Sequence, residues 1–193
     1  MKASIIGAAG AVAAWVAVGP ALAGSIQGTV ALAKASDAER TVVYIESVPE
    51  SSFKAPPAMI RLSQKGAIFN PGVLPIVRGS QVDMTNDDWV SHNVFSKSEP
   101  KVFDLSIYGQ DARRMVTFEK LGAVVVFCSI HPRMNAVILV LQNPFFTKPE
   151  RDGNFALPNV PPGTYKLKTY RPGGEPGSVV VKVPPSGSVA ARF

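Results

Sequence analysis

Residues 123–142 read AVVVFCSIHPRMNAVILVLQ, and this stretch decides the fold. Its two arms, Val124–Phe127 and Val137–Leu141, are short, continuous apolar runs rich in β-branched residues. Runs of this length and composition are typical of strands at the centre of a β-sandwich. The proline and the polar residues between the arms indicate a turn. The stretch therefore predicts two central strands joined by a tight turn.

The rest of the chain also has sequence patterns that are typical of β-strands. Apolar residues alternate over 26–32, "TVVYIESV" at 41–48 is another short apolar strand, and "SHNVFS" at 91–96 begins a further one. Beyond the N-terminus, a helical turn is predicted only around Asp111–Arg114. The sequence as a whole therefore predicts an all-β protein.

The composition changes at residues 142–155, "QNPFFTKPERDGNF", and the C-terminal part that follows has its own turn signals. Asp-Gly and Pro-Pro-Gly divide this part into alternating strands, which are too few for a stable sandwich of their own. The strands near the N-terminus are the available partners, so we expect a central sandwich inserted into a smaller one that both chain ends build. The predicted segments are a signal peptide at 1–23, N-terminal strands with a linker at 24–57, the central domain at 58–143 and the C-terminal strands at 144–193.

The N-terminus has the layout of a secretory signal peptide. Lys2 precedes an apolar run that ends in Ala21-Leu22-Ala23, a small-x-small pattern. Cleavage is expected between Ala23 and Gly24, which predicts a periplasmic or secreted protein with no membrane attachment afterwards. The alternative is an uncleaved membrane anchor, because the uncharged stretch 3–23 is just long enough to span a bilayer.

Charge and cysteine content narrow the function. The formal net charge of +6 falls to +5 once Lys2 is removed, and the positive residues are dispersed. The sequence has no basic run interleaved with aromatic residues, so nucleic acid is not an expected partner. Cys128 is the only cysteine and cannot form an internal disulfide. In an oxidising compartment its thiol needs another partner, and a metal ion is a suitable one.

Cys128, His131 and Met134 follow one another at intervals of three around the predicted turn. This spacing allows the three side chains to converge, and Pro132 stiffens the turn. The only other histidine, His92, begins an apolar segment that can lie beside the strand ending at Cys128. Two imidazoles, one thiolate and a weak thioether are the ligand set of a blue copper electron-transfer site.

At these residues the chain resembles the cupredoxins. The compact loop C-x-x-H-P-x-M looks like that of amicyanin, in which an upstream His followed by Asn supplies the remaining ligand. The corresponding residue after His92 is Asn93, which we expect to tie the two ligand-bearing loops together. The resemblance implies a Greek-key sandwich that binds one type-1 copper ion. The expected ligands are His92, Cys128, His131 and Met134, and the expected neighbours of the ligands are Asn93, Ser129 and Pro132.

The whole mature chain resembles the plastocyanin-like "methylamine utilization protein" family, a group of exported bacterial proteins. One departure is Pro132, because this family often carries Asp after the loop histidine. The C-terminal motif also resembles the carboxypeptidase regulatory-like, transthyretin-type sandwich. The motifs that carry the resemblance, in chain order, are Phe69 to Gly79, Asn86 to Asp88, His92 to Ser96, Cys128 to Met134 and Asp152 to Leu167.

The resemblance also implies a function. A protein of this kind carries single electrons between periplasmic redox proteins and is not an enzyme. The exposed edge of His131 would be the electron port, within an apolar patch that includes Pro132. Contacts with redox partners would be small and short-lived, as suits such transfer. Arg133 beside the port predicts an acidic region on a partner.

Other chemistries use some of the same residues. A copper storage or delivery protein requires the same ligands. Zinc accepts one cysteine and two histidines, but a structural zinc site requires a fourth strong ligand, and Met134 is a poor one. A Cys–His nucleophilic enzyme is a further alternative, and no third group that would orient the histidine is evident.

Two further features are interpreted from residue type. Asp83, Asp87 and Asp88 form a candidate paired-carboxylate site, but a solvated turn is the favoured interpretation, because Asp and Asn are common in turns. The terminal sandwich is interpreted as a scaffold or partner-docking element, with a non-redox carbohydrate-binding module as the alternative. The aromatic residues considered for a sugar platform are Tyr165, Tyr170 and Trp89.

Overall fold

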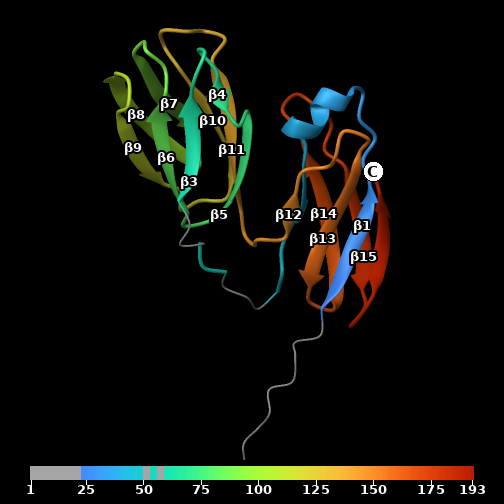
Figure 1. Ribbon diagram of the computed structural model, residues 1–193. Helices are drawn as coiled ribbons and strands as arrows, with labels where there is room; N and C mark the ends of the chain where they lie inside the picture. The colour runs from blue at the N-terminus through green and yellow to red at the C-terminus, as the bar shows by residue number, and fades with distance from the viewer. Residues whose placement is uncertain (1–22, 50–52, 56–58) are drawn as a thin grey trace, which may run out of the picture.

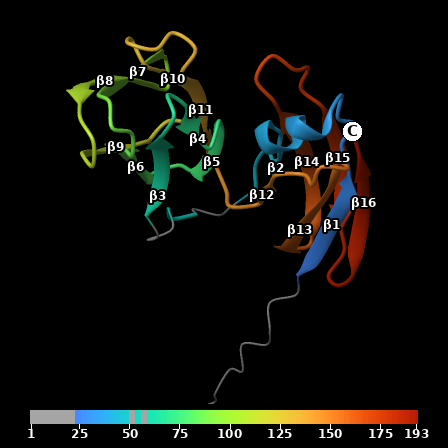
Figure 2. The ribbon, with the colours of Figure 1, turned by 45° about the horizontal axis from the view of Figure 1, so that its top comes forward.

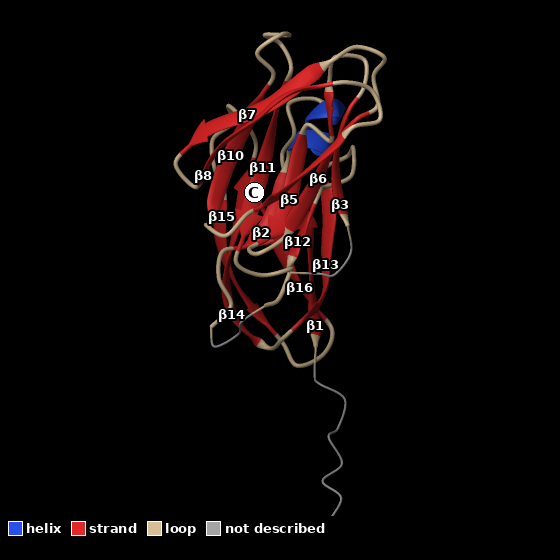
Figure 3. Ribbon diagram, turned by 90° about the vertical axis from the view of Figure 1, so that its left-hand side faces the viewer, coloured by secondary structure: helices blue, strands red, loops and turns tan. Residues whose placement is uncertain are grey.

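The computed structural model describes residues 23–49, 53–55 and 59–193, and nearly all of its regular structure is strand (Figure 3). The strands form four sheets, which pair into two sandwiches (Figure 1). The predicted all-β fold class is therefore confirmed. The expected signal peptide falls on residues 1–22, outside the described residues, so cleavage between Ala23 and Gly24 stays a prediction. In the described ranges, no helix is long and apolar enough to cross a bilayer.

The middle of the chain builds the first sandwich. Its strands are β3 (Ile60–Gln64), β4 (Phe69–Asn70), β5 (Val73–Val77), β6 (Gln81–Asn86), β7 (His92–Ser98), β8 (Lys101–Tyr108), β9 (Arg113–Thr117), β10 (Gly122–Phe127) and β11 (Asn135–Leu141). One sheet has the order β5-β11-β10-β7-β8 and the other β4-β3-β6-β9. The pairs β5–β11 and β3–β6 are parallel. The inner faces of the two sheets enclose one apolar core, which includes Leu62, Phe69, Met84, Val124 and Ile138.

Both ends of the chain build the second sandwich. Its strands are β1 (Gly24–Thr29), β2 (Val42–Ile45), β12 (Phe146–Thr147), β13 (Asn154–Val160), β14 (Gly163–Tyr170), β15 (Ser178–Val183) and β16 (Ser188–Arg192). The sheets have the orders β13-β1-β16 and β12-β2-β14-β15. Since β1 pairs in parallel with β16, the first and last strands lie next to each other (Figure 2). The chain leaves this sandwich after β2 and returns at β12, so the first sandwich is inserted into it.

The Asp-Gly turn before β13 shows why its glycine is needed. Gly153 has a φ of 89°, a conformation that disfavours residues with a Cβ atom. A Cβ at this position would also lie 2.3 Å from the carbonyl oxygen of Val30. The turn thus allows the start of β13 to approach the end of β1, with which it pairs.

Strand β11 is buried on both faces. Alternate residues from Ala136 to Val140 face the core of the first sandwich, and those from Val137 to Leu141 face a separate apolar cluster. Residues of both sandwiches form this cluster, so the two sandwiches pack against each other there. Burial on both faces explains why this strand is a continuous apolar run. The members of this inter-sandwich cluster are Val42, Val73, Val137, Leu139 and Leu141, with Tyr44, Ala123, Val125, Phe146 and Tyr170 packed against them.

Side-chain amides tie the two connections between the sandwiches together. Gln142 Oε1 accepts a hydrogen bond from the N–H of Val48 at 3.0 Å, and its Nε2 donates to the Val48 carbonyl at 3.2 Å. Asn143 Nδ2 donates to the carbonyl of Ile45 at 2.9 Å. The chain therefore leaves and re-enters the second sandwich at adjacent points.

Two local predictions were wrong. The structure has a 3-10 helix over Ala35–Arg40, where the sequence predicted none, because one short turn of helix leaves no measurable period. At Asp111–Arg114 the predicted helical turn is absent, and the chain passes from a turn at Asp111 through Ala112 into β9.

Leu139→Ala is expected to lower the free energy of unfolding by about 2–5 kcal/mol, because it leaves a cavity in the inter-sandwich cluster. Urea unfolding followed by circular dichroism measures this loss. Val180 on β15 is 65% exposed, so Val180→Ala serves as the control and should change stability by less than about 0.5 kcal/mol. Equally small losses in both variants would show that this face of β11 is not packed in solution.

Candidate metal centre

Backbone hydrogen bonds fix the loop between β10 and β11. The two strands pair antiparallel as far as Phe127 opposite Asn135. Beyond this pair, the N–H of Cys128 donates to the Met134 carbonyl at 3.2 Å. The N–H of Met134 donates to the His131 carbonyl at 2.8 Å and closes a tight turn. Both ends of the loop are thus continuous with the two central strands.

His92 approaches this loop from the neighbouring strand. It is the first residue of β7, which lies next to β10, and it is fully buried. His92 Nδ1 lies 3.1 Å from His131 Nδ1 and 4.0 Å from Cys128 Sγ. His131 Nδ1 lies 3.9 Å from Cys128 Sγ. The structure therefore brings three of the four predicted ligands together, with one donor atom from each inside a span of 4.8 Å.

The triangle of donor atoms fits a single metal ion. Metal–imidazole bonds are about 2.0–2.1 Å and metal–thiolate bonds about 2.3 Å long, so donors arranged trigonally around one ion lie about 3–4 Å apart. The three separations between His92, His131 and Cys128 fall in this range. Two imidazole lone pairs repel each other at 3.1 Å unless a proton or a cation lies between them.

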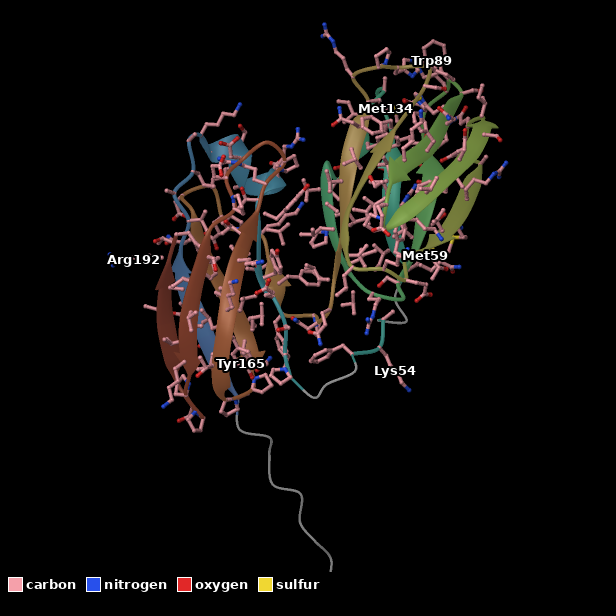
Figure 4. The ribbon with its side chains drawn as sticks, turned by 180° about the vertical axis from the view of Figure 1, so that it is seen from behind. Lys54, Met59, Trp89, Met134, Tyr165 and Arg192 are labelled. Atoms are coloured by element: carbon pink, nitrogen blue, oxygen red, sulfur yellow. The ribbon has the colours of Figure 1, made fainter. Side chains whose placement is uncertain are left out.

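Met134 lies on the core side of the loop and His131 nearer to solvent. Met134 is 1% exposed and belongs to the same apolar cluster as Cys128, so a thioether is available from the interior. His131 is half-buried, whereas Pro132 and Arg133 at the loop tip are exposed. The candidate site is thus closed toward the core and accessible along the edge of His131. Figure 4 shows Met134 at the end of the sandwich opposite the linker residue Lys54.

Asn93 joins the strand that carries His92 to the loop that carries Cys128. Its Oδ1 accepts hydrogen bonds from the N–H of Ser129 at 2.7 Å and from Ser129 Oγ at 2.9 Å. Asn93 is buried, so these bonds are shielded from competing water. The two segments that bring ligands to the site are therefore held at a fixed separation.

Asp88 holds His92 from the side opposite the triangle. Asp88 Oδ2 lies 2.7 Å from His92 Nε2, and the carboxylate also accepts hydrogen bonds from the N–H groups of Gly66 at 2.6 Å and Ala67 at 2.9 Å. Burial opposes ionisation, but these hydrogen bonds outweigh it and hold the pKa of Asp88 below its usual value. An ionised carboxylate only accepts hydrogen bonds, so Nε2 carries the hydrogen and Nδ1 is free to bind a metal.

The interpretation of the acidic residues as a solvated turn was wrong for two of the three. Asp83 is buried in β6 and accepts a hydrogen bond from Arg113 Nε at 2.9 Å. Asp88 is buried against His92, as described above. Only Asp87 is partly exposed, in an ion pair with Arg61 at 2.5 Å. Asp83 and Asp88 are buried because each has a specific partner, Arg113 and His92 respectively, and the residue type alone does not reveal such partners. The sequence signal for Asp88 was its place in the Asn86 to Asp88 motif, one of those that carry the family resemblance.

The three aromatic residues considered for a sugar platform do not share a surface. Tyr165 is buried in the core of the second sandwich, and Tyr170 packs against the inter-sandwich cluster. Trp89 is 85% exposed but lies on the first sandwich, at the same end as Met134 (Figure 4).

No family model and no curated protein sequence matches the chain. A purple cupredoxin from Nitrosopumilus maritimus is 28% identical, with a TM-score of 0.39, and the match covers 42% of this chain and 98% of that one. A Cu-containing nitrite reductase from Thermus scotoductus SA-01 is 24% identical, with a TM-score of 0.43, and the match covers 60% of this chain and 28% of that one. Amicyanin from Paracoccus versutus is 20% identical, with a TM-score of 0.40, and the match covers 51% of this chain and 96% of that one.

The structural neighbours thus include cupredoxins, at low identity and over part of the chain. The strand order and the His–Cys–His group define a β-sandwich with a candidate metal centre. Membership of the methylamine utilization protein family and the carboxypeptidase regulatory-like character of the second sandwich stay predictions.

Asn93→Ala is expected to lower the free energy of unfolding by about 1–3 kcal/mol, because it removes the acceptor for two hydrogen bonds. Ser129→Ala removes only the hydroxyl bond and should cost less. Urea unfolding of both variants separates the two contributions. Equal losses would mean that the bond from the Ser129 N–H contributes nothing measurable.

Proposed function

We propose that this protein is an exported type-1 copper protein that carries single electrons between periplasmic redox partners, and that it is not an enzyme. The convergence of His92 Nδ1, His131 Nδ1 and Cys128 Sγ in a β-sandwich carries the proposal. Thiolate and thioether ligands favour Cu(I), and imidazoles suit both oxidation states. Bound copper would supply a one-electron couple, with Met134 as the weak axial ligand.

The surroundings of the donors support electron transfer because they restrict movement. Electron transfer is faster when the ligands rearrange little between the two oxidation states. His92 is fully buried and hydrogen-bonded to Asp88, and the loop from Cys128 to Met134 is closed by its own backbone bonds. This rigidity favours electron transfer over copper delivery, because delivery requires a site that opens to release its ion.

The half-buried edge of His131 is the proposed electron port. Trp89 and Ile130 are 85% and 44% exposed, and with Pro132 they supply apolar surface near the loop. A small apolar contact of this kind suits a weak complex that dissociates quickly. Arg133 is also exposed there, which favours a partner with an acidic region.

We also infer the roles of the segments. Residues 1–23 direct export, and residues 58–143 form the copper-binding domain. Residues 24–57 and 144–193 form a terminal sandwich of the carboxypeptidase regulatory-like kind, which serves as a scaffold or docking element. Affiliation with the methylamine utilization protein family is part of the same proposal.

Adding Cu(II) to the purified protein is expected to give one intense thiolate-to-copper band near the red end of the visible spectrum. Cys128→Ala should abolish the band, because it removes the sulfur from which the charge transfer originates. Val180→Ala, on the exposed face of β15 in the second sandwich, is the control and should keep it. If one equivalent of Cu(II) gives no such band in the unaltered protein, the type-1 assignment fails.

Met134→Leu is expected to retain the colour and raise the reduction potential, because loss of the thioether destabilises Cu(II) more than Cu(I). Cyclic voltammetry measures the shift. Complete loss of copper would contradict the weak axial role and make Met134 a principal ligand. If the unaltered protein readily transferred Cu(I) to a chelator but showed no reversible potential, copper delivery would replace electron transfer as its function.

A further inference from the structure

We propose that Asp88 is the positioning residue of the copper centre: it selects Nδ1 of His92 as the ligand atom and lowers the reduction potential. The inference rests on the proposed copper function and concerns a residue that binds no metal itself. Its basis is the contact between Asp88 Oδ2 and His92 Nε2 at 2.7 Å, on the side of the ring away from Cys128 and His131.

The surroundings of Asp88 are arranged for a carboxylate. The tight turn between β3 and β4 places Gly66 and Ala67 at φ values of 66° and 53°. In this conformation the N–H groups of both residues converge on Asp88 and form a small anion-binding nest. A positive φ is unusual for alanine, so these bonds stabilise a backbone that would otherwise be disfavoured. The turn therefore fits a negative charge at position 88.

The carboxylate is itself held in place. The N–H of Asp88 donates to Asn86 Oδ1 at 2.9 Å, and Asn86 Nδ2 donates to the carbonyls of Val90 and Tyr108 at 2.9 and 3.0 Å. Asn86 is fully buried. Asp88 consequently cannot follow His92 if the imidazole turns, so it fixes both the orientation and the tautomer of the ring.

The charge of Asp88 acts on the metal through the imidazole. The side chains of His92 and Asp88 are 0% and 8% exposed, so solvent screens their interaction little. Copper carries one more positive charge when oxidised, and a nearby negative charge therefore stabilises Cu(II) more than Cu(I). Removing the charge should raise the potential and weaken Cu(II) binding.

The neighbouring acid provides a matched control. Asp88→Asn preserves the size of the side chain, removes the charge and replaces one oxygen by an NH₂ group, so one of the N–H groups of Gly66 and Ala67 loses its acceptor. Asp87→Asn makes the same charge change one residue earlier, in a solvent-exposed ion pair with Arg61. Water and salt screen this second position.

The experiment measures reduction potential and Cu(II) affinity in the copper-loaded unaltered protein and in both variants. Asp88→Asn should raise the potential and weaken Cu(II) binding about 10- to 100-fold, and Asp87→Asn should leave both close to their original values. Equal shifts in the two variants would overturn the proposal. A purely structural role for Asp88 would lower stability without a selective change in potential.

A second measurement needs no variant. In the copper-free protein, ¹⁵N NMR should show that the hydrogen of His92 is on Nε2, and a hydrogen on Nδ1 alone would overturn the proposal. This result is independent of copper binding. If the unaltered protein shows no copper band, the proposed function fails. If the band is present but His92 has the other tautomer, only the role of Asp88 fails.

Discussion

Burial of β11 on both faces is the constraint on which the rest of the structure depends. Ile138 and its alternate neighbours complete the core of the first sandwich, while Leu139 and its alternate neighbours pack against the second. A one-residue shift in register would exchange these two sets of side chains. The pairing of β11 with β10 is thereby fixed, and Cys128 and Met134 at the ends of the connecting loop are fixed with it. The loop therefore begins and ends in the most constrained part of the sheet.

Buried polar contacts fix the positions of the donor atoms relative to these strands. Asp88 follows β6 in one sheet, and His92 begins β7 in the other, so their hydrogen bond joins the two layers of the sandwich. Asn93 then joins β7 to the loop at Ser129. Because these groups are hydrogen-bonded and largely shielded from water, the network specifies one arrangement of the ligands rather than several. Apolar packing thus sets the positions of the strands, and polar contacts set the positions of the rings.

The sequence was sufficient for the all-β class and for the grouping of Cys128 and both histidines. Cysteine and histidine are rare in this chain, so the short spacing of Cys128 and His131 indicates a shared site even without a structure. Asp88 was misinterpreted because an acid in an Asn- and Asp-rich turn looks the same whether it is solvated or buried. Its role depends on the N–H groups of Gly66 and Ala67, which are close in space but distant in sequence. The second buried face of β11 was hidden for a similar reason, since a continuous apolar run does not reveal what covers each side.

The parallel pairing of β1 with β16 has a consequence for the order in which the protein folds. Strand β1 is synthesised before the other described strands, but both of its sheet neighbours, β13 and β16, follow the whole inserted sandwich in the sequence. Strand β1 therefore has no sheet partner until the inserted sandwich has been synthesised. A ribosome that releases the chain from its N-terminus would thus deliver the inserted sandwich, which carries the candidate metal centre, before the last strands of the second sandwich. The pairing of β1 with β13 and β16 is thus among the last contacts of the fold to form.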